Sequence, residues 1–372
     1  MPVLGTTRSV WILIESIKIH KTDRFQSARA TLCVQENPCR SWAAREWPTW
    51  VALVACYAIW FFAILWHDVL EWLWIVPAAL MVAFHSSLQH EALHGHPTRS
   101  GFLNEVLVFP ALGLFVPYRR FRDTHLRHHN NVLLTDPYDD PESWYLSRRD
   151  WHHTSPLMQC LLGVNATLAG RIVIGPVLAL YCFWRNDLGL IIARDRNVIR
   201  AYILHLAGAM PVIAILVWAG VPLWIYGLCA AYPGMSILMI RTFIEHRAEE
   251  TVSERTAVVE AGMVMRLLFL NNNFHAVHHD HPYMSWFELP VTWRQQKLDT
   301  LRSNANYYYP GGYLQVAGHW LLRRREPIEH PFMRRNIDDA CDRTFQPHGA
   351  DFGVAPSQPD GHAEALCQTT EP

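Results

Sequence analysis

Four long apolar stretches without a charged residue constrain the fold of this chain more than any other feature of its sequence. Each is 17 or 19 residues long, which is near the lower end of the roughly 17–25 residues that an α-helix needs to cross a bilayer. They form two close pairs. Each pair predicts a helical hairpin, because a chain in lipid must satisfy its own backbone hydrogen bonds. The predicted spans are Trp50–Trp66, Trp72–Leu88, Ala201–Ala219 and Pro222–Ile240.

The distribution of basic residues predicts the orientation of these spans. None of the 32 Lys and Arg residues lies in either apolar pair or in the link within it. Because positively charged segments stay on the cytoplasmic side, we expect the N-terminal segment 1–46, the central loop and the C-terminal part in the cytoplasm. The sequence therefore predicts an all-α integral membrane protein with four transmembrane helices and a cytoplasmic helical cap, over residues 47–345. Segment 346–372, rich in Pro, Gly, Gln and Asp, is expected to be disordered.

Three histidine clusters lie at the predicted cytoplasmic ends of these spans. The first, HEALHGH, has an H-x-x-x-H spacing, and the second and third, HLRHH and HAVHH, share an H-x-x-H-H spacing. Residues three and four apart lie on one face of a helix, so each cluster would present its imidazoles in one direction. Neutral imidazole binds zinc, copper, iron and nickel, and eight ligands suit two ions rather than one. The predicted ligands are His90, His94, His125, His128, His129, His275, His278 and His279.

Two further apolar segments are less regular than the four spans. Leu157–Trp184 is interrupted by Arg171 and by Pro176, and Phe102–Pro117 contains Glu105. If the first of them crossed the membrane once, the second hairpin would be inverted and the third histidine cluster would lie across the bilayer from the first. We therefore expect both segments at the membrane interface or buried in the cap, with Arg171 at a polar edge.

The composition excludes several other classes of protein. A net charge of −1 gives no broad attraction to nucleic acid. Eight cysteines without a C-x-x-C pair predict neither a disulfide framework nor a thiolate metal site. There is no Gly-rich dinucleotide-binding motif. The apolar run Val10–Ile17 is short, contains Glu15 and lacks a cleavage site, so we do not expect a signal peptide.

In their order and spacing among apolar spans, the histidine clusters resemble those of the membrane fatty-acid desaturase family and its hydroxylase and ketolase relatives. The resemblance covers roughly Trp47 to Tyr313. The segments HEALHGHPTR, YRRFRDTHLRHHN and LTDPYDDPES are similar to bacterial proteins of the desaturase type. The resemblance implies two iron ions held by the cluster histidines, with O2 as co-substrate. It also implies a ninth ligand, His246, which directly follows the fourth span.

The same resemblance implies the reaction and its setting. O2 and two electrons would convert CH2–CH2 to CH=CH and release water, at the cytoplasmic face of a bacterial inner membrane. The substrate is either a fatty-acyl chain or a small amphiphilic molecule, and hydroxylation or ketone formation stays open because these enzymes share the ligand spacing. Tyr309 stands where a fused cytochrome b5 domain has its haem histidine before Pro310-Gly311-Gly312. We therefore expect a separate ferredoxin-like or cytochrome b5-like electron donor.

Other residues near the clusters are candidates to orient the imidazoles. A solvated loop or a helix cap accounts for them equally well. They are Asp123, Asp136, Asp139, Asp140, Glu245, Asp280 and Asn271–Asn273. His85, His96, His205 and His281 are further candidate ligands, whereas no metal is expected at His20, His152, His153, His319, His330, His348 and His362.

Two alternatives of other classes remain open. His90-Glu91-Ala92-Leu93-His94 matches the H-E-x-x-H signature of zinc metalloproteases, in which Glu91 would be the general base. That interpretation leaves both H-x-x-H-H clusters unexplained. A metal-binding or metal-transport protein without catalytic activity is the other alternative. Transport would place ligands within the spans, whereas these lie at their ends.

Overall fold

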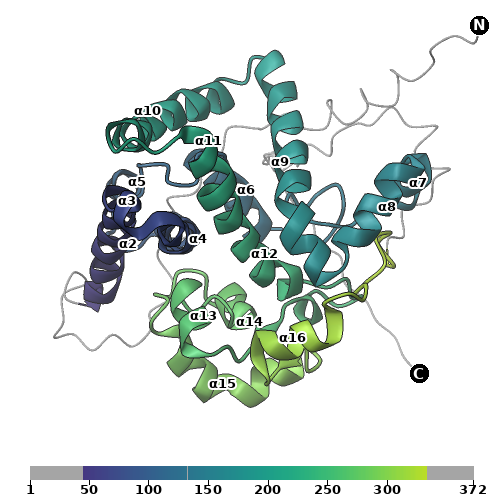
Figure 1. The fold of residues 1–372 in the computed structure, drawn as a ribbon. Helices are drawn as coiled ribbons and strands as arrows, with labels where there is room; N and C mark the ends of the chain where they lie inside the picture. Colours follow the sequence, from purple (N-terminus) through teal and green to yellow (C-terminus); the bar gives the residue numbers. More distant parts are fainter. Residues whose placement is uncertain (1–44, 132, 333–372) are drawn as a thin grey trace, which may run out of the picture. The chain divides into compact units, whose positions relative to one another are not determined.

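The computed structural model describes residues 45–131 and 133–332, which are mostly helical (Figure 1). Of the predicted N-terminal segment only Arg45 and Glu46 are described, and the predicted tail 346–372 lies outside the described residues. The four described cysteines are free: Cys56, Cys160, Cys182 and Cys229.

The first predicted hairpin is present. Helix α2 (Trp47–Leu65) begins with Pro48 in its first turn, where the missing N–H costs nothing. The short helices α3 (His67–Leu70) and η3 (Glu71–Trp74) reverse the chain, and α4 (Ile75–Leu93) packs against α2. Large apolar side chains of both long helices are exposed, as expected of surfaces that face lipid.

The second predicted hairpin is also present, with an irregular second arm. It consists of α10 (Arg196–Trp218) and, after a tight link, α11 (Leu223–Tyr226), the π-helical turn η4 (Gly227–Ala231) and α12 (Tyr232–Glu245). The π turn ends two residues before Pro233, which has no N–H to continue a regular helical ladder.

Between the hairpins lies a fifth long apolar helix. The predicted apolar segment 157–184 is divided into α8 (Pro156–Asn165) and α9 (Leu168–Ile192), and Thr167 caps α9 by accepting a hydrogen bond from the backbone N–H of Gly170. The sequence predicted four spans, but the described residues contain five helices that are long and apolar enough to cross a membrane, and α9 is the additional one.

Helix α12 connects the two hairpins. It packs against α4 on one side and α9 on the other, as Figure 1 shows. Gly234 makes the contact with α4 possible, because a Cβ at this position would lie 2.5 Å from the Cγ1 of Val82. Small residues of this kind let membrane helices approach closely.

Most of the remaining elements form a cap at the ends of α4 and α12. Around the third histidine cluster, a small apolar core of Val258, Phe274, Val277, Leu289 and Trp293 supports the cap. Strands β1 (Val258–Val259) and β2 (Tyr308–Tyr309) pair in parallel. The cap helices are α6 (Tyr118–His129), α7 (Arg148–His153), η5 (Val252–Arg255), α13 (Met263–Leu268), α14 (His275–Asp280), α15 (Leu289–Ser303) and α16 (Gly312–Trp320). Helix α5 (Gly101–Leu107) instead ends against α2, where the hydroxyl of Tyr57 donates to the carbonyl of Leu107. Segment 102–117, predicted to be interfacial or buried, forms α5 and an irregular stretch in which Ala111 and Leu112 are buried and the N–H of Ala111 bonds the carbonyl of Gly208 in α10.

Candidate metal centre

The first histidine cluster lies at the end of the first hairpin. His90 is in the last turn of α4, and His94 is the residue that ends this helix. Gly95 follows with a φ of +99°, a conformation that favours glycine. The chain therefore turns away immediately after His94, and the rings of His90 and His94 contact rings of the second and third clusters.

The second and third clusters lie on two short cap helices. His125, His128 and His129 occupy the last two turns of α6. His275, His278 and His279 are on α14, which starts after a turn in which Leu270 and Asn271 have positive φ values of 47° and 57°. The H-x-x-H-H spacing thus places three rings on one side of each helix, as the sequence predicted.

His246 joins the three clusters. It ends α12 in an extended conformation and pairs with Thr256 in an isolated antiparallel bridge. Its Nε2 atom lies 3.0 Å from Nε2 of His128 and 2.9 Å from Nε2 of His275. The residue that family resemblance alone indicated therefore lies between the second and third clusters.

The nine histidines fall into two groups, each of which could hold a metal ion. In each group one ring nitrogen per residue lies within 4.8 Å of the others. We call them the five-histidine group and the four-histidine group. The first contains His90, His94, His125, His129 and His278, and the second contains His128, His246, His275 and His279. Both groups draw on at least two sequence clusters, so neither could form without the folded cap.

The spacing of the nitrogens fits a metal ion. Nε2 atoms of His278 and His129 are 3.1 Å apart, and those of His279 and His275 are also 3.1 Å apart. Metal–imidazole bonds of about 2.0–2.1 Å predict roughly 2.9–3.4 Å between neighbouring ligand nitrogens in octahedral or tetrahedral geometry. Within the described chain, both ring nitrogens of His94 and Nε2 of His125 are buried without a hydrogen-bond partner. Unpaired nitrogens at such spacing fit an ion better than a packed core.

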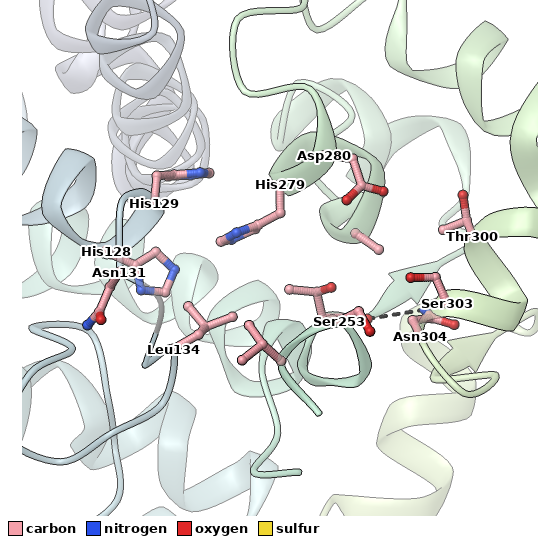
Figure 2. A pocket seen from close by; sticks show the side chains of 13 residues that line it. His128, His129, Asn131, Leu134, Ser253, His279, Asp280, Thr300, Ser303 and Asn304 are labelled. Carbon is pink, nitrogen blue, oxygen red and sulfur yellow. Dashed lines mark hydrogen bonds between the residues drawn. The ribbon is translucent and has the colours of Figure 1, made fainter. Parts of the chain in front are cut away.

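A cavity reaches both groups from the side formed by η5, α14 and α15. Its volume is about 190 Å³, and His129 of the five-histidine group and His128 and His279 of the four-histidine group lie in its wall (Figure 2). None of the residues that line it belongs to the five long apolar helices.

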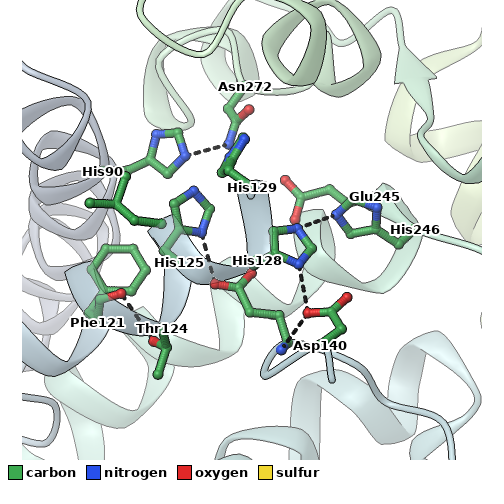
Figure 3. A network of polar contacts seen from close by, with 12 residues as sticks. His90, Phe121, Thr124, His125, His128, His129, Asp140, Glu245, His246 and Asn272 are labelled. Atoms are coloured by element: carbon green, nitrogen blue, oxygen red, sulfur yellow. Dashed lines mark hydrogen bonds and ion pairs between the residues drawn. The ribbon is translucent and has the colours of Figure 1, made fainter. Parts of the chain in front are cut away.

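Carboxylates fix the rings of the second cluster. Asp140 accepts a hydrogen bond from Nδ1 of His128 at 2.8 Å, and Glu142 accepts one from Nδ1 of His125 at 2.8 Å (Figure 3). The backbone N–H of Thr135 holds the second oxygen of Asp140 at 2.8 Å. A proton on Nδ1 leaves Nε2 free for a metal ion. Asp140 was among the predicted partners, whereas Glu142 was missed because only the folded loop brings it to His125.

The third cluster is oriented by an amide and a carboxylate. Oδ1 of Asn272 lies 3.1 Å from Nδ1 of His275, and its Nδ2 is 3.5 Å from Nε2 of His90. Glu245 lies 3.4 Å from the same Nδ1 of His275. Asn272 and Glu245 therefore do contact the histidines, as two of the predicted partners. Asn271 and Asn273 instead bond the backbone carbonyls of Trp286 and Val259.

Burial keeps most of these imidazoles neutral. It lowers the pKa of His129 to about 2 and holds those of His94, His246, His275, His278 and His279 well below the ordinary value. At His128 burial acts in the same direction, but the carboxylates of Glu142 and Asp140 outweigh it and raise the pKa to about 9. Metal ligation requires the neutral ring, and most of the set is already in that form near pH 7.

The other candidates have separate roles. His85 contacts the hydroxyl of Tyr57, His205 contacts the carbonyl of Leu114, and His281 contacts Gln296. His96 bonds Glu46 and the carbonyl of Tyr283. None of these four belongs to either group within the described residues.

The remaining predicted partners have other contacts, and the remaining histidines belong to neither group. Asp123 binds Arg122, Asp136 caps a turn, the carbonyl of Asp139 accepts from Arg127, and Asp280 lines the cavity. Among the histidines for which no metal was expected, His152, His153, His319 and His330 are outside both groups. His20, His348 and His362 lie outside the described residues.

Comparison with known proteins identifies the family. A comparison with curated proteins gave no match. The model of the fatty acid desaturase family matches residues 78–310, which is more than half of the chain and contains all nine histidines of the two groups. The chain belongs to the fatty acid desaturase family.

Proposed function

We propose that this protein is a membrane-bound, O2-dependent desaturase whose two histidine groups each hold one iron ion. The arrangement of nine imidazoles in a group of five and a group of four is the observation that carries this proposal. Membership in the family makes the protein an oxidoreductase of the desaturase or hydroxylase type. The ligands would be His90, His94, His125, His129 and His278 for one ion and His128, His246, His275 and His279 for the other.

The protein supplies positions and protonation states for this chemistry. When bound, the iron ions supply the O2 activation that an unactivated C–H bond requires and that no side chain provides. Asp140 and Glu142 hold the rings of His128 and His125 with Nε2 free. The ligands of both groups are imidazoles, so they add no negative charge, and this favours an electron-poor, oxidising centre.

The proposal includes the kind of substrate and the kind of product. A fatty-acyl chain and a small amphiphile such as dihydrorhizobitoxine, whose desaturation would belong to rhizobitoxine biosynthesis, are the two candidates. A hydroxylase or ketolase would use the same ligands, because the position of the substrate carbons decides the product. Mass spectrometry of lipids and small amines from cells with and without the gene identifies the substrate and separates C=C formation from C–OH or C=O formation.

The membrane arrangement is proposed as four spans, α2, α4, α10 and the α11–α12 arm, with α9 at the interface. The exposed apolar side chains of α9 recur every three or four residues and so form one stripe, which supports this placement. They are Val173, Val177, Tyr181, Trp184, Leu188 and Ile192. The centre would then face the cytoplasm of a bacterial inner membrane and receive electrons from a ferredoxin-like or cytochrome b5-like partner.

The position of Glu91 argues against the zinc protease alternative. This side chain is buried, and its carboxylate accepts a hydrogen bond from the backbone N–H of Trp286 at 3.2 Å. It therefore supports the loop after the third cluster. Glu91→Gln retains an acceptor for this bond, so we expect desaturation to persist in the variant, whereas a general base would not tolerate the change.

The proposal is tested by purified protein with a reductant and O2. His128→Ala and His278→Ala should each abolish product formation and lower bound iron, and His319→Ala on the exposed face of α16 should do neither. Equal iron contents in all three variants would contradict the ligand assignment.

A further inference from the structure

Two neighbouring helices of the cap leave apolar side chains exposed. They are Met263, Val264 and Leu267 of α13 and Leu314 of α16. Three of the four are between 75% and 87% exposed. Both helices begin shortly after the parallel strands β1 and β2 end, and a Cβ at Gly312 would lie 2.8 Å from the backbone oxygen of Glu260. Helices α13 and α16 therefore start side by side, and we call their four exposed residues the apolar cap surface.

Every exposed position within α13 is apolar, whereas the exposed side of α15 is mixed. The only charged residue of α13, Arg266, donates to Oδ1 of Asn271 at 3.0 Å and is thereby held toward the turn before the third cluster. On the inner sides of the two helices, Leu268, Tyr313 and Val316 are buried. A mixed helix face suits water, but a face of apolar residues alone requires an apolar partner. The exposed residues of α15 include Arg294, Gln295, Leu298, Asp299 and Arg302.

Contacts with two predicted spans place these helices at the edge of the hydrocarbon layer. The hydroxyl of Ser87, which lies within the second predicted span, donates to the carbonyl of Leu268 at 2.9 Å. The ring of Phe269 lies 5.9 Å from the guanidinium carbon of Arg241, which directly follows the fourth predicted span. Phe269 also contacts the ring of Tyr313 in α16, with 5.6 Å between the ring centroids. Both helices therefore lie level with the histidine-bearing ends of these spans, and α13 packs against α4 there (Figure 1).

From these observations we infer that the apolar cap surface is inserted among the acyl chains of the leaflet that borders the cap. Because α13 packs against α4, whose own exposed apolar side chains face lipid, the same leaflet covers both. After α13 the chain runs through Asn271–Asn273 to His275, so the leaflet contacts the element that precedes the third histidine cluster. This inference goes beyond the proposed function, because it depends neither on a bound metal ion nor on the reaction.

The test uses the full-length protein in proteoliposomes of phosphatidylcholine and phosphatidylglycerol, in a background without native cysteines. A nitroxide is attached at Val264→Cys, at Leu314→Cys and, as a matched control, at Leu298→Cys, which replaces an exposed leucine of α15. O2 collects among acyl chains, whereas nickel ethylenediaminediacetate, supplied on both sides of the bilayer, stays in water. We expect the ratio of O2 relaxation to nickel relaxation to be several-fold higher at the first two positions than at the control. Variants that bind Co²⁺, used in place of iron, as the wild type does have a folded cap.

The wild-type protein tests the same contact without a substitution. A phospholipid with a diazirine in the middle of its acyl chain should crosslink to peptides that contain α13 and the start of α16, and mass spectrometry should find α15 unlabelled. Nickel relaxation at the two test positions as strong as at the control would show that the surface faces water and would overturn the inference. Relaxation by neither agent would overturn it as well, because protein then covers the surface, and dipolar broadening between labels at Val264→Cys would identify a second copy. Equal crosslinking of α13 and α15, or none to α13, would also contradict insertion.

Discussion

At the scale of single residues, the candidate centre depends on what each imidazole does with its second nitrogen. Asp140, Glu142 and Asn272 engage Nδ1 of His128, His125 and His275, and each contact leaves Nε2 for a metal ion. The ligand spacing was visible in the sequence because it is local to two helical turns. Glu142 was not predicted, because its contact with His125 depends on the path of a loop.

The buried imidazoles make a specific prediction about pH for the metal-free protein. Their folded-state pKa lies below the unfolded value of about 6.5. Their contribution to stability is therefore complete above pH 6.5 and is lost as the pH falls, by up to about 1.4 kcal/mol per pH unit for each ring. His128, raised to about 9, acts in the opposite direction and loses its contribution as the pH rises through 9. Thermal unfolding in detergent should show a lower Tm at pH 5.5 than at pH 7.5. A Tm that is the same at both pH values would contradict neutral burial.

At the scale of elements, the contact of α4 with α12 sets the distance between the first cluster and His246. Both helices end at the centre, and they touch closely where Gly234 faces Val82 and the carbonyl of Ala79. A change in this contact should affect both histidine groups. Helix α4 carries His90 and ends at His94, which belong to the five-histidine group, and α12 ends at His246 of the four-histidine group.

Gly234→Ala should therefore damage both stability and metal binding. The new Cβ would meet Val82 at 2.5 Å and the backbone oxygen of Ala79 at 3.0 Å, so the helices must separate. Overpacking of this kind costs about 1–3 kcal/mol, and we expect a lower Tm and weaker Co²⁺ binding. Gly227→Ala is the control, because a Cβ there meets no atom within 4 Å. Equal behaviour of the two variants would show that the contact does not position the histidines.

The segment after α16 is a second positioning element, although it lies beyond the family match. Arg325 donates hydrogen bonds to the backbone carbonyl of His246, at 2.6 Å, and to the hydroxyl of Tyr307. Nearby, the backbone of Leu146 pairs with Ile328 and His330, which ties the loop after Asp140 to the same segment. The C-terminal segment therefore holds the carbonyl of one candidate ligand and the loop that orients another.

Arg325→Ala should weaken the four-histidine group selectively. Without the guanidinium the end of α12 loses its anchor, so a Co²⁺ titration should show one site of nearly wild-type affinity and one weakened roughly tenfold or more. Arg325→Lys keeps a donor for the carbonyl of His246 and should restore part of the affinity. Arg323→Ala removes an exposed arginine from the same segment and should match the wild type. Equal weakening of both sites would contradict a selective role.

At the scale of the whole molecule, the question is which side of the membrane each helix end occupies. Near its N-terminal end, α9 contacts Phe243 of α12 through Arg171, only a few residues before His246. Near its C-terminal end, Asp187 binds Arg120 of α6, the polar helix that carries the second cluster. Both ends of α9 therefore contact elements that lead to the centre, which supports the four-span arrangement.

Cysteine labelling distinguishes four spans from five. In a background without native cysteines, four spans place Ala219→Cys on the outer side and Arg196→Cys on the cytoplasmic side. A crossing by α9 exchanges these two positions. We expect an impermeant maleimide to label Ala219→Cys in intact cells and Arg196→Cys only after permeabilisation. The reverse pattern would show that α9 spans the membrane.

Much of this architecture could be predicted from the sequence, for physical reasons that also explain the omissions. The hairpins were predictable because their spans lack charge. The assignment of histidines to two groups was not, because His278 joins the first two clusters while its neighbour His279 joins His128 and His246. Which ring joins which group depends on how α6 and α14 meet in the folded protein, and the sequence does not give that arrangement. The length of α9 was also missed, since Pro176 was read as a break and is accommodated within the helix.

The metal content of the purified protein tests most directly whether the nine histidines hold two iron ions. Elemental analysis compares the wild type with His94→Ala, which removes a ligand of the five-histidine group, and with His275→Ala, which removes a ligand of the four-histidine group. We expect two iron atoms per chain in the wild type and fewer than two in each variant. One zinc atom per chain, lost in His94→Ala and retained in His275→Ala, would contradict it.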